Sequence, residues 1–326
     1  MRVLVTGGAG YIGSHTVREL RRLGHDITIV DRFITGHRAA LLADCVEADI
    51  GDEESIARVC REGGIEGAIH FAAFCAAGES VIDPGKYFRN NVQGTIGLMN
   101  GLTAAGVKHV VLSSSSAVYG TQEEVPIGED APKNPESPYG ESKLMCERLL
   151  PWYETAGGPN WVALRYFNAS GASSDASLGD DARPATRALP VALEVALGKR
   201  PEFSLFGDDY PTVDGTCIRD YVHVEDLAHA HVLALDYLAG GGASDVLNVG
   251  SGRGFSNREL IDAVKRLTGV DFRVVIHPRR AGDPVVTQAD IAKIRRVLGW
   301  APEHDLDAMV RTAWEWRRRN PDGYPE

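Results

Sequence analysis

Short apolar runs alternate with longer segments of helical periodicity along the first half of this 326-residue chain. The runs are rich in Val, Ile and Leu with little polar interruption, which is typical of strands buried on both faces. They lie at residues 2–6, 26–30, 67–71, 109–113 and 161–167, and the clearest helical segments lie at 11–23, 52–61, 88–105 and 139–150. This alternation predicts an α/β fold, a doubly wound parallel (Rossmann) sheet with helices on both faces.

The composition and the hydrophobic pattern of the sequence change after Asn168. Residues 169–186 are small, polar and irregular, which predicts a loop. Shorter mixed elements follow, with helices expected near 224–240, 256–267 and 305–319. We therefore expect a Rossmann domain over residues 1–168, to which a segment near 219–240 returns, and a smaller mixed α/β domain over 169–326.

The composition excludes several classes of partner. With 34 basic and 45 acidic residues the net charge is −11, so binding to nucleic acid or to an anionic membrane is not expected. No apolar run approaches the ~20 residues of a membrane span, and no signal peptide is visible at the N-terminus. The ten histidines show no metal-binding spacing, so no metal is expected. Scattered cysteines, odd in number, fit a reduced cytoplasmic protein: Cys45, Cys60, Cys75, Cys146 and Cys217.

A glycine-rich turn joins the first strand to the first helix. Gly7, Gly10 and Gly13 form a G-x-x-G-x-x-G pattern in the stretch TGGAGYIGSH. Glycine there allows a sharp turn and a close approach of backbone N–H groups to a pyrophosphate, which the start of a helix also attracts. A glycine triplet can also serve only to turn the chain, so the pattern alone is weak evidence for a nucleotide.

An acidic residue at the end of the second strand strengthens the nucleotide interpretation. Asp31 stands where a carboxylate accepts hydrogen bonds from the adenosine ribose hydroxyls and repels a 2′-phosphate. It favours NAD over NADP, although the neighbouring Arg32 weakens this exclusion. Asp49 and Ile50 are candidates to hold the adenine edge.

Tyr139 and Lys143 lie four residues apart, directly behind Pro138. On an ordinary surface helix such a pair means little. Here it follows the hydroxyl-rich strand end SSSSAVYG, and doubly wound sheets bind ligands at the carboxyl ends of their strands. A phenol needs about 3 pKa units of stabilisation, or ~4 kcal/mol, to act as a base near neutral pH. A cation some 4 Å away supplies about that much at an effective dielectric near 20.

The narrower sequence strings carry a family resemblance. They include HFAA, GESV, NNVQGT, SPYGESKLM, LRYFN, FGDDYPTVDGT, IRDYVHVEDLA, PRRAGD and NPDGYP. Together with the glycine turn, these strings make the chain resemble the extended short-chain dehydrogenase/reductase family nearly end to end, and within it the UDP-glucose (UDP-galactose) 4-epimerases. The glycine turn and Y-x-x-x-K are shared by the whole family, whereas the longer strings point to the epimerases.

The resemblance implies a reaction and a division of roles. It implies that UDP-glucose and UDP-galactose are interconverted by oxidation at C4, rotation of the 4-keto sugar and re-reduction with tightly bound NAD. Tyr139 is then the base, Lys143 its activator and the anchor of the nicotinamide ribose, and Ser115 the hydroxyl that bonds the sugar O4. Residues 1–168 would bind NAD and residues 169–326 the UDP sugar. The helices 88–105 and 139–150 would form the interface of a homodimer.

The resemblance also assigns binding residues. The implied cofactor contacts are Gly7, Gly10, Tyr11, Ile12, Gly13, Asp31, Asp49, Ile50, Phe71, Ala72, Ala73, Asn90, Tyr139, Lys143 and Phe167, with Phe71 to Cys75 lining the cofactor. The implied substrate contacts are Ser115, Tyr139, Asn168, Phe206, Arg219, Arg280, Asp283 and Thr287. Two arginines suit a pyrophosphate, and a phenylalanine can stack on uracil.

Three positions depart from the family pattern. Cys75 stands where many epimerases carry lysine, the role of Arg187 is open, and Thr287 stands where some relatives carry a bulky aromatic residue. A small residue at 287 leaves space beside the sugar, so UDP-GlcNAc and UDP-GalNAc are also possible substrates. The preferred sugar stays open.

Other functions remain as alternatives. One is another NAD-dependent nucleotide-sugar epimerase or a 4,6-dehydratase, but dehydratases carry a Thr-Asp-Glu string where this chain has Ser115-Ser116-Ala117. A non-enzymatic alternative is a dinucleotide-sensing protein, which would typically lose the tyrosine or the lysine. This chain has both.

Overall fold

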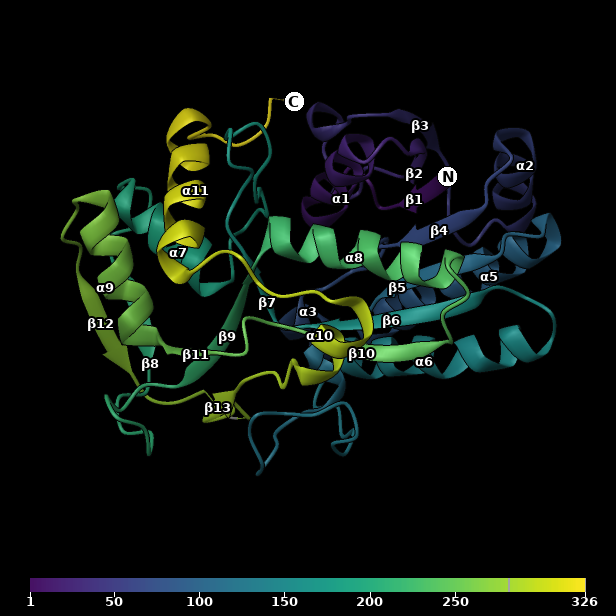
Figure 1. Cartoon of the computed structure of the whole chain (residues 1–326). Helices are drawn as coiled ribbons and strands as arrows, with labels where there is room; N and C mark the ends of the chain where they lie inside the picture. The colour runs from purple at the N-terminus through teal and green to yellow at the C-terminus, as the bar shows by residue number, and fades with distance from the viewer. Residues whose placement is uncertain (281, 326) are drawn as a thin grey trace.

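The computed structural model describes residues 1–280 and 282–325. Within these ranges the largest element is a seven-stranded sheet with the order β10-β6-β5-β4-β1-β2-β3 (Figure 1), and all its pairings are parallel. Its strands are β1 (Arg2–Thr6), β2 (Asp26–Asp31), β3 (Asp44–Glu47), β4 (Gly67–His70), β5 (His109–Ser113), β6 (Asn160–Tyr166) and β10 (Asp245–Val249). The α/β class and the doubly wound parallel sheet are therefore confirmed.

The strand order reverses at β1. This strand pairs with β2 on one side and with β4 on the other, so Thr6 lies opposite both Val30 and His70. The connections that leave β1 and β4 therefore go to opposite sides of the sheet. Open parallel sheets bind ligands at such a switch point, outside the carboxyl ends of the strands.

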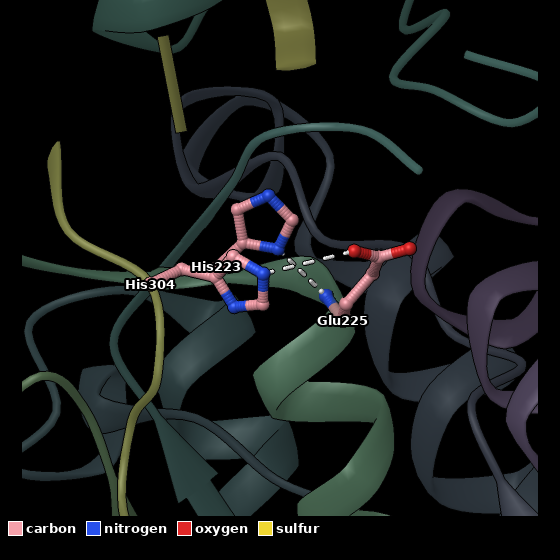
Figure 2. Close-up of side chains that lie close together, drawn as sticks. All are labelled: His223, Glu225 and His304. Atoms are coloured by element: carbon pink, nitrogen blue, oxygen red, sulfur yellow. Dashed lines mark hydrogen bonds and ion pairs between the residues drawn. The ribbon is translucent and has the colours of Figure 1, made fainter. Parts of the chain in front are cut away.

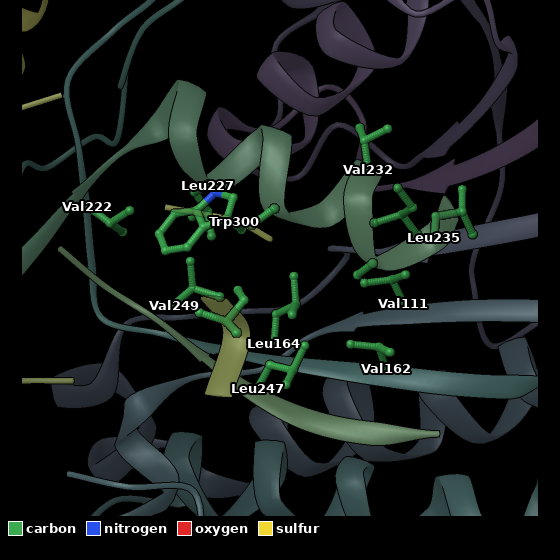
Figure 3. Close-up of a cluster of buried hydrophobic side chains, with 14 of the residues drawn as sticks. Val111, Val162, Leu164, Val222, Leu227, Val232, Leu235, Leu247, Val249 and Trp300 are labelled. Carbon is green, nitrogen blue, oxygen red and sulfur yellow. The ribbon is translucent and has the colours of Figure 1, made fainter. Parts of the chain in front are cut away.

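Helices cover both faces of the sheet. One face carries α1 (Tyr11–Arg22) and α8 (Val224–Ala239), and the other carries α2 (Glu53–Gly63), α5 (Gly94–Ala105) and α6 (Pro138–Thr155). Figure 3 shows the first of these cores. Leu227, Val232 and Leu235 of α8 point down onto aliphatic side chains of β5, β6 and β10 such as Val111 and Leu247. Each face thus has its own apolar core, as a parallel sheet requires.

The rest of the C-terminal half forms a smaller mixed lobe. Strands β7, β11 and β13 surround β9, and β8 pairs with β12. The lobe's core lies between these strands and helices α7, α9 and α11. The bounds are β7 (Asn168–Ser170), α7 (Ala188–Ala196), β8 (Phe203–Phe206), β9 (Ile218–His223), β11 (Gly254–Ser256), α9 (Asn257–Thr268), β12 (Val274–His277), β13 (Val286–Thr287), α10 (Ala292–Leu298) and α11 (Leu306–Arg319).

Two details differ from the sequence predictions. The returning segment continues beyond 219–240, because β10 adds an edge strand to the large sheet beside β6. The predicted helix 88–105 is divided into a π-helical segment Phe88–Gln93 and α5, and the short helix α4 (Pro84–Tyr87) precedes them. The Asn91 side chain explains the irregular turn, since it bonds the backbone of Phe74 and the hydroxyl of Ser142.

The remaining short elements are 3-10 turns at Arg38–Ala40 and Ser116–Val118 and the helix α3 (Ala77–Ile82). Among the described residues, no helix combines the length and the apolar character that a membrane crossing requires.

Candidate active site

The glycine turn forms a cradle in which side chains have no room. A Cβ on Gly13 would lie 2.2 Å from the carbonyl oxygen of Gly7, and one on Gly7 would lie 2.7 Å from the backbone nitrogen of Ala72. Gly7 also has a φ of 74°, which favours glycine. The helix α1 starts directly behind the turn, and no side chain caps its first N–H groups. This cradle fits the pyrophosphate of a dinucleotide.

Asp31 is held in a fixed orientation at the end of β2. Its carboxylate accepts hydrogen bonds from the backbone N–H groups of Ala9 (3.0 Å) and Phe33 (2.8 Å), and the residue is buried. The guanidinium of Arg32 pairs with the carboxylate of Asp49. Because Asp49 partly neutralises Arg32, the acid at Asp31 keeps its effect against a 2′-phosphate.

A single pocket brings together almost all of the predicted cofactor residues. Its wall includes Gly7, Gly10, Tyr11, Ile12, Gly13, Asp31, Asp49, Ile50, Phe71, Ala72, Ala73, Asn90, Tyr139 and Lys143. Phe74 and Cys75 also line it, as predicted for the stretch Phe71 to Cys75. The residues were chosen from six separate segments of the sequence, so their convergence supports a dinucleotide site at the switch point.

Phe167 is the predicted cofactor residue that does not lie in this wall. It is 5% exposed and packs in the core beneath α8, and its backbone N–H donates to the carbonyl oxygen of Val249. The preceding residue, Tyr166, lines the pocket instead and receives a hydrogen bond from Ser113 (3.3 Å). A cofactor role for Phe167 therefore stays a prediction. The string RYFN could have pointed to Tyr166 as well.

The start of α6 delivers Tyr139 to the pocket. Ser137 caps the helix by accepting a hydrogen bond from the backbone of Gly140 (3.2 Å), and Pro138 occupies the first turn. Tyr139 follows at once, and its backbone N–H donates to Ser80 (3.1 Å). The reactive phenol is thus fixed at the beginning of a rigid helix.

The surroundings of the Tyr139 phenol act on its acidity in both directions. Burial raises its pKa well above the usual value, whereas a hydrogen bond with Ser115 and the positive charge of Arg187 act against this rise. Ser115 is 7% exposed and also accepts a hydrogen bond from the backbone of Ala117 (3.1 Å). Ser115 and Tyr139, which the sequence predicted separately as substrate contacts, are therefore neighbours in the structure.

Lys143 lies one turn further along α6 and is 3% exposed. Its Nζ donates to the carbonyl oxygen of Ser113 at 2.8 Å, and burial lowers its pKa. Between the described residues, no hydrogen bond joins Nζ to the Tyr139 hydroxyl. The activation of Tyr139 by Lys143 thus stays a prediction, although both groups line the same pocket.

A buried ion pair that the sequence did not reveal lies behind these groups. Arg165 of β6 binds both carboxylate oxygens of Glu147, with Nη2 to Oε2 at 2.6 Å and Nε to Oε1 at 2.9 Å. Both side chains are 5% exposed. The hydroxyl of Ser114 also donates to Glu147, and Arg165 donates to the hydroxyl of Tyr119 (2.9 Å). The pair connects α6 to β6, and Ser114 links it to the residue that follows β5.

Apart from Ser115 and Tyr139, the predicted substrate residues belong to the C-terminal half of the chain. Arg219 pairs with Asp283 (Nη2 to Oδ1, 2.6 Å), and Thr287 lies next to Arg219 because β13 pairs with β9 in that register. The guanidinium of Arg280 lies 3.7 Å from the centre of the Phe206 ring. The smaller lobe thus contains two cations, an aromatic face and a carboxylate at the predicted positions, and their binding of one ligand stays a prediction.

Asn168 connects this cluster to the sheet. Its side-chain amide donates to the carbonyl oxygen of Asp220, the neighbour of Arg219 (2.8 Å). It also begins β7 two residues after Tyr166 of the pocket wall. Asn168 therefore links the predicted substrate residues of the smaller lobe to the wall of the cofactor pocket.

His223, Glu225 and His304 form the group of possible metal ligands found among the described residues (Figure 2). The two imidazole rings are stacked, with centroids 4.1 Å apart and planes at 20°. Ring nitrogens bind metals through lone pairs in the ring plane, so stacked rings do not converge on one ion.

Both rings of this group already have partners. Nδ1 of His223 accepts from the Glu225 backbone and its Nε2 contacts Thr312, while Nδ1 of His304 contacts Asp226 at 2.7 Å. Burial lowers the pKa of His223 to about 3, and the hydrogen bond with Asp226 raises that of His304. The group is a packing contact between β9 and the segment before α11, and the absence of a metal stays a prediction.

Comparisons with known proteins agree with this geometry. A model of the NAD dependent epimerase/dehydratase family matches residues 3–250. The UDP-glucose 4-epimerase of Lactobacillus helveticus is 46% identical over 329 residues, which cover 100% of both sequences. The crystal structure of UDP-glucose-4-epimerase from Stenotrophomonas maltophila, with bound NAD and formylated UDP-arabinopyranose, has a TM-score of 0.96 at 42% identity and covers 99% of each chain. The Bifidobacterium longum UDP-glucose 4-epimerase in complex with NAD⁺ and UDP has a TM-score of 0.93 at 37% identity, covering 99% of this chain and 100% of that one.

Proposed function

The chain belongs to the NAD dependent epimerase/dehydratase family, and we infer that it interconverts UDP-glucose and UDP-galactose with NAD as its cofactor. The observation that carries this conclusion is the position of Tyr139 and Lys143. Both are buried one turn apart on α6 in the wall of the dinucleotide pocket, at the carboxyl edge of the sheet. A phenol and an ammonium at this place suit hydride chemistry at a sugar carbon that bears a hydroxyl.

We propose the following roles for the chain's own residues. Tyr139 accepts the proton of the sugar 4-hydroxyl and later returns it, and Ser115 holds the sugar O4 by a hydrogen bond. Lys143 is kept in place by the carbonyl of Ser113 and contributes positive charge beside the phenol. NAD, when bound, supplies the hydride acceptor and donor. The 4-keto sugar turns between the two steps, so that it is reduced on its opposite face.

We propose that residues 1–168, together with the returning α8 and β10, bind NAD and that residues 169–326 provide the UDP-sugar site. The Arg219–Asp283 pair and the Phe206–Arg280 stack support this division. Arginines match the pyrophosphate oxygens, and an aromatic face matches uracil.

The two alternatives have less support. The segment Ser115 to Ala117 contains no acid that could assist the loss of water, which disfavours a 4,6-dehydratase. A dinucleotide sensor would not need a buried tyrosine and lysine in contact with the pocket, and this chain has both.

The proposed function can be tested without added cofactor. Purified protein should convert UDP-galactose to UDP-glucose. Denaturing the protein should release NAD, which mass spectrometry then detects. Absence of turnover from a folded, NAD-containing protein would contradict the epimerase assignment.

A Lys143→Met variant should shift the pH dependence of kcat to higher pH. Removing the ammonium takes a cation away from the Tyr139 phenolate, so the phenol becomes a weaker acid. The pH–rate profile of the variant checks this. Lys108→Met is a control because Lys108 is exposed before β5. An unchanged profile in the Lys143 variant would remove the proposed role.

The width of the substrate site gives a second prediction. Thr287 is half-buried beside Arg219, where a small side chain leaves space for an N-acetyl group. We propose that UDP-GlcNAc and UDP-GalNAc are also interconverted, and that Thr287→Tyr lowers this activity at least about tenfold while hexose turnover is retained. Burying the amide of the N-acetyl group without a partner would cost about 1–3 kcal/mol, so the Thr287 hydroxyl also matters.

Thr287→Val separates these two effects, because valine keeps the volume and removes the hydroxyl. Both substrate pairs should be assayed on the wild type and on both variants. If the wild type fails to turn over N-acetyl sugars, the open-site proposal is wrong and the enzyme is restricted to hexoses.

We also propose a homodimer built from α5 and α6. Ile96, Met145 and Trp152 on these helices are exposed, and Trp152 is 75% exposed. Covering these side chains with a second copy would remove apolar area from water. Light scattering at micromolar concentration should give twice the mass of one chain, and a monomeric mass would refute the proposal.

A cytoplasmic location is proposed as well. All five cysteines are free thiols, as expected in a reducing compartment.

A further inference from the structure

One cation in the cofactor pocket has no role in the mechanism described above. Arg187 directly precedes α7 and lines the same pocket as Tyr11 and Tyr139. Its side chain is 40% exposed. The residue comes from the smaller lobe and lies beside Tyr11, which directly follows Gly10 of the glycine turn.

The contacts of Arg187 hold it beside the start of α1. Its Cζ lies 5.4 Å from the centre of the Tyr11 ring, and Tyr11 is the first residue of that helix. The hydroxyl of Tyr11 donates to the carbonyl oxygen of Gly171 (2.7 Å), which ties the helix to the loop that leads to Arg187. Nη2 of Arg187 donates to Oδ2 of Asp180 at 2.6 Å, and the Asp180 side chain is only 12% exposed.

The hydrogen bond with Asp180 uses a small part of the hydrogen-bond donor capacity of the guanidinium. A guanidinium has five N–H donors, and the bond to Asp180 uses one of them, on Nη2. Planar guanidinium groups bind phosphate oxygens through two parallel hydrogen bonds. Arg187 can therefore keep its ion pair with Asp180 while it binds an oxyanion in the pocket.

The charges along the pocket wall show why an oxyanion would use Arg187. The other two cations of the wall pair with groups of the wall itself, Arg32 with Asp49 and Nζ of Lys143 with the carbonyl of Ser113. The partner of Arg187, Asp180, does not line this pocket. Asp31 and Asp49 add negative charge at the adenosine end. A bound pyrophosphate carries two further negative charges between these ends. The field of Arg187 reaches this part of the pocket, because its charge acts to lower the pKa of Tyr139.

We propose that Arg187 binds a pyrophosphate oxygen in the pocket, beside the N-terminus of α1. This inference rests on the proposed function, since it requires that the pocket holds a dinucleotide beside a nucleotide sugar. The phosphate belongs either to NAD or to the UDP sugar, and both present the same oxyanion chemistry. The helix N-terminus and Arg187 would then both hold a pyrophosphate, one from each lobe.

The test measures nucleotide binding directly. Arg187→Ala and Arg187→Gln are compared with the wild type, and Arg187→Gln keeps most of the side-chain stem. Arg200→Ala is the matched control, because Arg200 pairs with Glu194 at 2.6 Å beyond the other end of α7 and does not line the pocket. Release of NAD from the purified holoenzyme is followed by dilution and mass spectrometry. Affinity for UDP is measured by calorimetry on the same samples.

Loss of a charged hydrogen bond should weaken binding by about 10- to 100-fold in both Arg187 variants. Faster NAD release identifies the dinucleotide as the source of the phosphate, and weaker UDP binding identifies the nucleotide sugar. Unchanged NAD release and unchanged UDP affinity in Arg187→Gln would overturn the proposal. Thermal unfolding of each variant checks that the fold is retained. An inactive wild type that still binds NAD through Arg187 would refute the epimerase function but not this contact.

Discussion

A Tyr139→Phe variant is expected to lose at least about 100-fold in kcat while it keeps its fold and its bound NAD. General acid–base catalysis usually contributes 10²–10⁴-fold, and the substitution removes only the hydroxyl that accepts and returns the proton. The ring stays, so the packing at the start of α6 is retained. Steady-state turnover of UDP-galactose and mass spectrometry of released NAD give the two readouts.

The pH dependence of the wild type supplies a second check on the same residue. Burial raises the pKa of Tyr139 well above its usual value, so the phenol of the protein alone is protonated at neutral pH. A base acts only in its deprotonated form, and the rate should therefore rise with pH across the neutral range. This rise should disappear in Tyr139→Phe.

Tyr153→Phe is the matched control for this substitution. Tyr153 lies on the same helix and its hydroxyl contacts Asn100 at 2.7 Å, away from the pocket. This control should keep near-normal turnover. Near-normal turnover in Tyr139→Phe itself would remove Tyr139 from the mechanism.

The elements that the sequence predicted well are those whose pattern is local. The apolar runs 2–6 and 109–113 coincide with β1 and β5, because strands buried on both faces show a nearly continuous apolar sequence. The glycine turn and the Tyr139–Lys143 spacing are also local, and the structure brings both into one pocket. Local patterns therefore predict the cofactor site without information on tertiary contacts.

The features that the sequence did not predict depend on contacts between distant residues. Strand β10 joins the sheet through its pairing with β6, in which Asp245 lies opposite Val162, 83 positions earlier in the chain (245 − 162). Arg187 reaches the pocket from the smaller lobe, and nothing in its neighbours indicates that direction. Sequence spacing cannot reveal such partners, because they are decided by how the two lobes pack.

The Glu147–Arg165 pair left one signal in the sequence. Arg165 interrupts an apolar strand, and a charged residue within a buried strand needs a partner of opposite charge. The sequence could not identify Glu147 as that partner, since several acids lie at similar distances along the chain. Only the packing of α6 against β6 decides this.

Breaking this pair should cause the largest loss of stability among the substitutions considered. Arg165→Met leaves the Glu147 carboxylate 5% exposed without its cation, with the hydroxyl of Ser114 as its remaining partner. Removing one partner of a buried ion pair typically costs about 3–5 kcal/mol, because the remaining charge is neither solvated nor paired. The bonds from Arg165 to Tyr119 and to the Glu129 carbonyl are lost as well.

The double variant Glu147→Leu/Arg165→Met distinguishes an unpaired charge from a simple loss of packing. Apolar residues of similar volume often replace a buried ion pair at little cost, so the double variant should regain most of the stability that Arg165→Met loses. Urea unfolding of the wild type, both single variants and the double variant gives the coupling energy. The NAD concentration must be the same throughout, because bound ligand adds to the apparent stability. If the two single losses simply add in the double variant, the pair is not coupled, and the cost of Arg165→Met comes from packing alone.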